Sequence, residues 1–325
     1  MPGPLLRFEP LLKRILWGGR RLGDVLKKPI GDHVDYAESW EIVDHGTDQS
    51  VVREGVHAGR ALGDLFHDER EWLMGQSWCA SHPAADRFPL LLKYLDCNRV
   101  LSVQVHPNDE QGAHLDPPDL GKTEAWYVVH AEPESVIYAG LKEGINRDRL
   151  AECVAAGTTE DALHSFRPSA GDCVFIPAGT VHALGGGLLI AELQQSSDTT
   201  FRLFDWNRVG ADGQPRQLHI EESLAVTDFE RGPVDPVKPS ADGGLVACDK
   251  FELQLHDESD ASRFTIGGDG RCHVLTMVGG SAQLIDAEGA TTDVCTGESV
   301  LLPAASGVIQ VTLSEGGQLL HGVPV

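Results

Sequence analysis

The 325-residue sequence contains seven cysteines but no Cys-x-x-Cys pair. The missing pair argues against a thiolate zinc knuckle, and the odd number argues against a complete disulfide framework. No apolar run approaches the ~20 residues that a membrane-spanning helix needs. The first nineteen residues carry Arg7, Glu9, Lys13 and Arg14, unlike the apolar stretch of a secretory leader. We therefore expect a cytoplasmic protein with reduced thiols and no membrane partner.

Basic residues are scarce, with 26 Lys and Arg against 49 Asp and Glu and a formal charge of −23. A chain this acidic repels a phosphate backbone, so we expect no nucleic-acid partner. If the substrate is an anion, a few cationic side chains must reverse the local field. Cations that lie near other candidate site residues are therefore informative.

Long uninterrupted runs of helix formers are also rare, whereas 36 glycines and 18 prolines are spread along the chain. These proportions favour many strands joined by turns. The apolar spacing changes only between 146 and 166, which predicts one or two short helices broken at Gly157. The segment 233–244 is rich in Gly, Pro and Asp, and we interpret it as a linker.

An internal similarity points to a duplicated fold. Residues 171–178 (GDCVFIPA) are echoed 126 residues later by 297–304 (GESVLLPA). Each copy contains a turn, an acidic residue, an apolar strand and a proline, and each follows another apolar strand, at 126–129 or 273–278. The pattern predicts two β-barrel halves of common ancestry. The alternative is that two eight-residue segments match by chance.

Polar residues on otherwise apolar strands are candidate metal ligands. Side chains alternate along a strand, so Gln104 and His106 share one face, away from Val103 and Val105. Glu124 begins a further strand, and a Pro-Ala-Gly turn leads to a histidine at position 182. Taken singly, each has an ordinary structural reading, such as a solvated face or a hydrogen-bonded histidine. Together they offer nitrogen and oxygen ligands without thiolate, which suits Zn, Mn, Fe or Ni.

Several linked segments resemble the type I phosphomannose isomerase family, in its short bacterial form. The segments that carry this resemblance are 17–19 (WGG), 38–41 (ESWE), 88–93 (FPLLLK), 101–107 (LSVQVHP), 121–124 (GKTE), 171–182 (GDCVFIPAGTVH) and 193–202 (LQQSSDTTFR). The likeness is dense from 88 to 130 and from 170 to 208, and thin beyond about 240.

The resemblance implies a cupin fold. We therefore predict a mainly β protein with two cupin-type jelly-roll barrels and a short helical insertion, at about 144–166, in the first. Residues 1–235 would form the catalytic domain and residues 236–325 a degenerate cupin-like domain. The second copy has Val308 at the position that His182 takes in the first, so we expect no equivalent site there.

The resemblance also implies roles for individual residues. It implies one divalent ion, with zinc as the usual ion of the family, and a small sugar phosphate as the partner. The implied metal ligands are Gln104, His106, Glu124 and His182. The implied catalytic arginine is Arg202, and Lys122 and Ser102 would lie near the sugar phosphate. Gln104 is a neutral amide, so it either binds the ion or orients one of its ligands.

An aldose–ketose isomerisation needs a base, a partner for the enediolate oxygen and a phosphate clamp. Arg202 cannot be the base because its pKa exceeds about 12, so we assign it to oxyanion stabilisation or substrate binding. Glu192 lies among apolar residues, and burial would raise its pKa towards a useful range. We prefer Glu192 as the base over Lys122 or a metal-bound water. A structural pairing of Glu192 with Arg202 or Arg208 would give the same sequence pattern.

The resemblance thus implies a mannose-6-phosphate isomerase that interconverts mannose 6-phosphate and fructose 6-phosphate through a metal-assisted enediolate. One alternative is a cupin oxygenase, which would use similar ligands around iron but would not need Lys122 or Arg202. Another is a sugar-phosphate-binding bicupin without catalytic activity. The sequence does not predict an oligomeric state.

Overall fold

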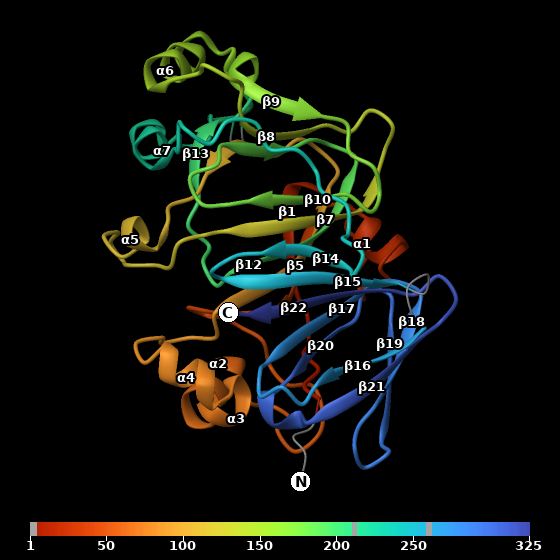
Figure 1. Ribbon diagram of the computed structural model, residues 1–325. Helices are drawn as coiled ribbons and strands as arrows, with labels where there is room; N and C mark the ends of the chain where they lie inside the picture. The colour runs from red at the N-terminus through yellow and green to blue at the C-terminus, as the bar shows by residue number, and fades with distance from the viewer. Residues whose placement is uncertain (1–4, 210–212, 258–261) are drawn as a thin grey trace.

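Short apolar strands build four antiparallel sheets in the computed structural model, which describes residues 5–209, 213–257 and 262–325 (Figure 1). The first sheet has the strand order β1-β2-β5-β12-β7-β10. Its strands are β1 (Leu11–Gly19), β2 (Tyr36–Ile42), β5 (Leu90–Cys97), β12 (Leu188–Gln195), β7 (Glu124–Ala131) and β10 (Cys173–Ile176).

The second sheet packs against the first and has the order β13-β6-β11-β8-β9. Its strands are β13 (Phe201–Phe204), β6 (Val103–Val105), β11 (His182–Leu184), β8 (Ile137–Leu141) and β9 (Leu163–Phe166). Ile137 and Leu184 from this sheet share one buried cluster with Trp126 and Ile190 from the first. These two sheets form the first barrel.

The other two sheets form the second barrel, with orders β14-β15-β22-β17-β20 and β16-β21-β18-β19. The strands of the third sheet are β14 (Gly244–Ala247), β15 (Phe251–Asp257), β22 (Gln318–Pro324), β17 (His273–Gly279) and β20 (Ser299–Leu302). Those of the fourth are β16 (Arg263–Gly267), β21 (Val308–Leu313), β18 (Ser281–Ile285) and β19 (Thr291–Cys295). A small ladder of β3 (Asp44–His45) and β4 (Asp48–Gln49) completes the strands described.

The two barrels are stacked through the first and third sheets. On β12, Ile190 faces the interior of the first barrel, whereas Leu189 and Leu193 face the opposite way. Leu189 and Leu193 belong to the largest buried cluster, together with Leu253 and Leu320 of the third sheet. Figure 1 shows the blue strands β16 to β22 below β7, β10 and β12. The first sheet is therefore apolar on both faces except where polar residues enter the barrel.

Helices connect several of the strands. They are α1 (Arg21–Asp24), α2 (Leu62–Asp68), α3 (Arg70–Met74), α4 (Gln76–Ser81), α5 (Asp109–Gly112), α6 (Arg147–Ala156) and α7 (Ile220–Val226), with short 3₁₀ turns η1 (Thr159–Ala162) and η2 (Ala304–Ser306). Residues from α6 and α7 pack on the outer face of the second sheet. Among the described residues, none of the helices is both long and apolar enough to cross a bilayer.

The predicted helical insertion is confirmed, with one correction at its end. Helix α6 ends at Gly157, whose positive φ of 73° forms the left-handed C-cap that glycine favours. Residues 163–166 were expected within the helical insertion but form strand β9 instead. This strand pairs with β8, which would otherwise have an unpaired edge.

The predicted pair of β-barrels is confirmed, and the repeats occupy matching places. Strand β10 pairs with β7 so that Ile176 lies opposite Glu124. Strand β20 pairs with β17 so that Leu302 lies opposite His273. The domain boundary near residue 235 remains a prediction, since the described strands resume only at β14.

Candidate active site

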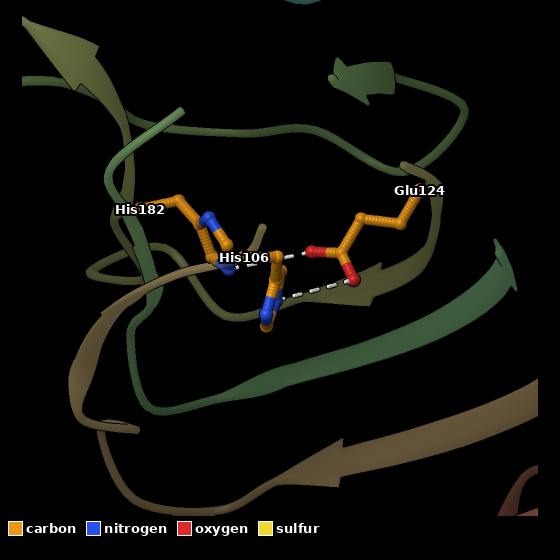
Figure 2. Close-up of side chains that lie close together, drawn as sticks. All are labelled: His106, Glu124 and His182. Carbon is orange, nitrogen blue, oxygen red and sulfur yellow. Dashed lines mark ion pairs between the residues drawn. The ribbon is translucent and has the colours of Figure 1, made fainter. Parts of the chain in front are cut away.

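Three buried side chains converge inside the first barrel. Glu124 begins β7 in the first sheet, His182 begins β11 in the second, and His106 directly follows β6. His182 Nε2 lies 3.3 Å from Glu124 Oε1, and His106 Nε2 lies 3.7 Å from Glu124 Oε2 (Figure 2). Their candidate ligand atoms all lie within 4.8 Å of one another. The residues that the sequence singled out as ligands are therefore brought together.

Backbone carbonyls fix the orientation of both imidazoles. His106 Nδ1 donates to the carbonyl oxygen of Thr199 at 2.9 Å, and His182 Nδ1 donates to that of Thr180 at 2.9 Å. Each Nδ1 therefore carries a proton, which leaves the Nε2 lone pair directed towards Glu124. Burial lowers the pKa of both histidines, that of His182 to about 3. Both rings are consequently neutral, as metal ligands must be.

The carboxylate of Glu124 fits a cation. Both of its oxygens are buried and accept no well-formed hydrogen bond within the part of the chain that the structure describes. The Lys122 ammonium lies 2.8 Å from Glu124 Oε2 and 3.1 Å from His106 Nε2. Buried acceptors without hydrogen bonds are costly unless a positive charge lies beside them. Two neutral imidazoles and one carboxylate form a donor set that suits a divalent transition metal.

Gln104 lies next to this cluster. It pairs with His182 across the β6–β11 ladder, and its Nε2 lies 3.2 Å from His182 Nε2. The amide group thus reaches the same imidazole nitrogen that faces Glu124. Val103 and Val105 point into the opposite cluster, as the predicted alternation requires.

A cavity of about 370 Å³ opens beside the cluster. It is lined by the predicted residues Ser102, Gln104, Lys122, Glu192 and Arg202, and also by Ile15, Trp17, Glu38, Lys93, Leu95, Leu101, Trp126, Leu184, Asp198, Thr200 and Arg216. Four of these residues are cationic, although the chain as a whole is strongly acidic. The expected local reversal of charge is therefore present at this cavity.

Glu192 forms the anionic part of a buried charged group. Its Oε1 lies 3.2 Å from Lys93 Nζ and 3.8 Å from Lys122 Nζ. Burial raises the pKa of Glu192, while Lys93 opposes the shift. A pair of Glu192 with Arg202 or Arg208 was the structural alternative, but in the structure Glu192 pairs with Lys93.

Arginines line another part of the cavity. Arg202 donates from Nη1 to the carbonyl oxygen of Gln217 at 2.9 Å, but its Nε is buried without a hydrogen-bond partner among the described residues. Burial lowers the pKa of Arg202, and the charge of Arg216 adds to the effect. Arg216 binds Asp205 through two nitrogens, at 2.7 and 2.5 Å. Arg202 thus lines the cavity with a guanidinium that forms no ion pair among the described residues, so its charge is available to an anion.

The sequence did not single out Glu38, Asp198 or Arg216 as lining residues, and it left Lys93 as a possible charge at the barrel rim. Lys93 was detectable in principle, because it shares the β5 face that carries Leu95 into the barrel. Arg216 lies in a Gly- and Pro-containing stretch without periodicity, and no local pattern indicates it.

Comparison with known proteins identifies the family. The family profile described as "Phosphomannose isomerase type I, catalytic domain" matches residues 5–138. Mannose-6-phosphate isomerase ManA of Bacillus subtilis is 38% identical over 228 residues, 70% of this chain and 69% of its own. Mannose-6-phosphate isomerase of Streptococcus mutans is 40% identical over 226 residues, 70% of this chain and 68% of its own. The chain belongs to the type I phosphomannose isomerase family.

A solved structure extends this likeness to the whole fold. The mannose 6-phosphate isomerase of Bacillus subtilis superposes with a TM-score of 0.86 at 27% identity, covering 98% of this chain and 99% of that one. The predicted family, the mainly β cupin fold and the isomerase class are thereby confirmed. A metal site at His106, Glu124 and His182 is supported, without the identity of the ion.

Proposed function

We propose that the protein interconverts mannose 6-phosphate and fructose 6-phosphate in the cavity of the first barrel. The decisive observation is the buried His106–Glu124–His182 cluster at a cavity that also holds cations and a buried carboxylate. The family supports a sugar phosphate as the substrate. All seven cysteines are free, which supports a cytoplasmic location.

We infer that His106, Glu124 and His182 hold a single zinc ion, and that Gln104 either joins them or orients His182. A bound divalent ion supplies Lewis-acid polarisation of the sugar oxygens. The neutral, oriented imidazoles and the carboxylate without hydrogen bonds support this assignment.

Glu192 is our candidate for the base. It would take the proton from C2 of the open-chain aldose phosphate and return it to C1, while the hydroxyl proton passes from O2 to O1, so that the carboxylate is regenerated in each turnover. Burial keeps its pKa raised, which strengthens it as a base, and Lys93 holds it in place. Lys122 lies between Glu192 and the metal ligands, where its charge can stabilise the enediolate oxygen.

The remaining cations fit a phosphate dianion. Arg202 lines the cavity without an ion-pair partner among the described residues, and Ser102 offers a hydroxyl at the same cavity. Arg216 adds a second guanidinium whose carboxylate partner holds it in position. We assign Arg202 to substrate binding and oxyanion stabilisation, with Lys122 and Ser102 near the sugar phosphate. We keep residues 1–235 as the proposed catalytic domain and 236–325 as the proposed degenerate domain.

A coupled assay with mannose 6-phosphate, with and without a chelator, tests the proposal. We expect turnover that a chelator abolishes and added Zn²⁺ restores. Oxygen consumption without isomerisation would favour an oxygenase, and tight binding without turnover would favour a sugar-phosphate sensor. The cationic lining of the cavity speaks against the oxygenase, because that chemistry needs no phosphate clamp.

A further inference from the structure

The carboxylate of Asp119 lies at the centre of a hydrogen-bond network behind the metal ligands. Asp119 precedes β7 by five residues, and its side chain is only 10% exposed. Its Oδ2 accepts hydrogen bonds from Ser197 Oγ and Thr199 Oγ1, each at 2.9 Å. On the other side, Arg87 Nη1 donates to Oδ1 at 3.0 Å, and His45 Nε2 lies 3.2 Å from Oδ2.

This network reaches a metal ligand through one residue. Thr199 binds Asp119 with its hydroxyl and accepts the Nδ1 proton of His106 with its carbonyl oxygen. A shift of the Thr199 backbone would therefore change the orientation of the His106 imidazole ring. The hydrogen bond to Nδ1 sets both the tautomer and the direction of the Nε2 lone pair.

Gln194 holds the start of the loop that carries Thr199, and Asp119 holds the side chains of Ser197 and Thr199 that follow. Gln194 Nε2 donates to the carbonyl oxygen of Ser197 at 2.6 Å, before the loop turns towards the cavity. Asp198 and Thr200, on either side of Thr199, both line the cavity. The hydroxyl bonds from Ser197 and Thr199 are charge-assisted, and such bonds are the stronger class.

We propose that Asp119 is a positioning residue that aims His106 at the metal through Thr199. This inference rests on the metal centre proposed above. Burial alone would raise the pKa of Asp119, but the hydrogen bonds with His45, Thr199 and Ser197 outweigh it and lower the pKa. A lowered pKa agrees with a carboxylate that stays ionised across the physiological range. The residue itself does not touch the ligand cluster, so its effect must pass through the loop.

Co²⁺ binding to the full chain tests the proposal, with affinity measured by chelator competition and coordination by the visible absorption of the bound ion. Thr199→Val keeps the shape and the carbonyl but removes the hydroxyl bond to Asp119. We expect both Thr199→Val and Asp119→Ala to bind Co²⁺ about ten-fold more weakly and to change the absorption of the bound ion. Substituting the hydrogen-bond partners of metal ligands typically lowers metal affinity about 10–100-fold. Thr199→Ser restores the hydroxyl and should keep the wild-type affinity and spectrum.

A matched control separates positioning from general destabilisation. Asp96 is another buried carboxylate, 3.0 Å from Arg21, and it lies outside this network. Asp96→Ala should lower the free energy of unfolding without changing the Co²⁺ affinity. If Thr199→Val binds Co²⁺ with wild-type affinity and spectrum, the positioning role is wrong while the proposed function stands. A wild-type protein that binds no Co²⁺ would instead overturn the metal centre itself, and the positioning role with it.

Discussion

Glu192→Gln replaces the proposed base with a neutral amide of nearly the same shape. Glu192 and Lys93 are both almost fully buried, with 3.2 Å between Oε1 and Nζ. At that distance the attraction is about 5 kcal/mol for an effective dielectric constant near 20. Removing one partner of a buried pair costs about 3–5 kcal/mol. Because the amide oxygen can still accept a hydrogen bond from Lys93, we expect the free energy of unfolding to fall by about 3 kcal/mol.

The same substitution should remove proton transfer. Loss of a general base lowers the rate by about 10²–10⁴-fold. The direct measurement is exchange of the C2 proton of mannose 6-phosphate with deuterated solvent, at saturating substrate and with the metal bound. Exchange reports the proton-transfer step even when product release limits turnover.

A second variant keeps the stability loss from being mistaken for a catalytic effect. Combining Glu192→Gln with Lys93→Gln removes both charges, so no unpaired ammonium remains buried. We expect the double variant to recover part of the lost stability but to remain defective in C2 exchange. Unimpaired exchange in a folded Glu192→Gln protein would remove Glu192 from the role of base and leave Lys122 or a metal-bound water.

Three further predictions address the phosphate clamp, the second barrel and the backbone. Arg216→Ala should raise KM for mannose 6-phosphate several-fold more than it lowers kcat, in steady-state kinetics, because it removes a cation from the cavity but leaves Arg202. Burial lowers the pKa of His273 and His321 in the folded chain. Below about pH 6.5 the unfolded chain therefore binds protons that the folded chain does not, and the free energy of unfolding should fall as the pH drops. Urea unfolding at pH 7.5 and 5.5 should show a shallower decline for His321→Gln, and an unchanged slope would contradict this. Gly297→Ala should destabilise more than Gly316→Ala in thermal melts: both have positive φ, but only the Cβ at 297 would meet a carbonyl oxygen, at 2.1 Å.

The strands and the metal ligands could be predicted because their signals are local. Alternation along residues 101–106 places Gln104 and His106 on one face whatever the rest of the chain does. The repeated turn–strand–proline segments likewise predict equivalent positions in two barrels. Alternation does not show which face of the strand lies inside the barrel. The linked segments that resemble the isomerase family indicated that face.

The residues that the sequence missed owe their roles to long-range packing. Alternation places Lys93 on the inward face of β5, but the carboxylate that compensates its buried charge, Glu192, comes from the neighbouring strand β12. Helices α2 to α4 are each five to seven residues long, too short for a clear helical period, and their apolar residues join the core between the barrels. Packing stabilises such helices, so local propensity predicts them poorly.

The two barrels show why matching strands are not enough for a metal site. The strand pairings of the two barrels show which positions are equivalent. His273 in the second barrel corresponds to Glu124 in the first, and His321 corresponds to Glu192. His273, His321 and His256 form a row, with nitrogen–nitrogen distances of 2.8 and 3.2 Å, that ends at the Asp269 carboxylate.

Within that row, His321 uses both ring nitrogens for its neighbours, so the imidazoles cannot all point at one ion. In the first barrel the sheet opposite Glu124 supplies both converging histidines, His106 and His182, whereas the second barrel has the half-exposed Val308 at the position of His182. A cluster that can bind metal therefore requires donors from both sheets of one barrel. Substituting His182 would leave His106 and Glu124 as two of the three clustered donors, so metal binding measured by chelator competition should weaken strongly even though both remaining side chains stay buried.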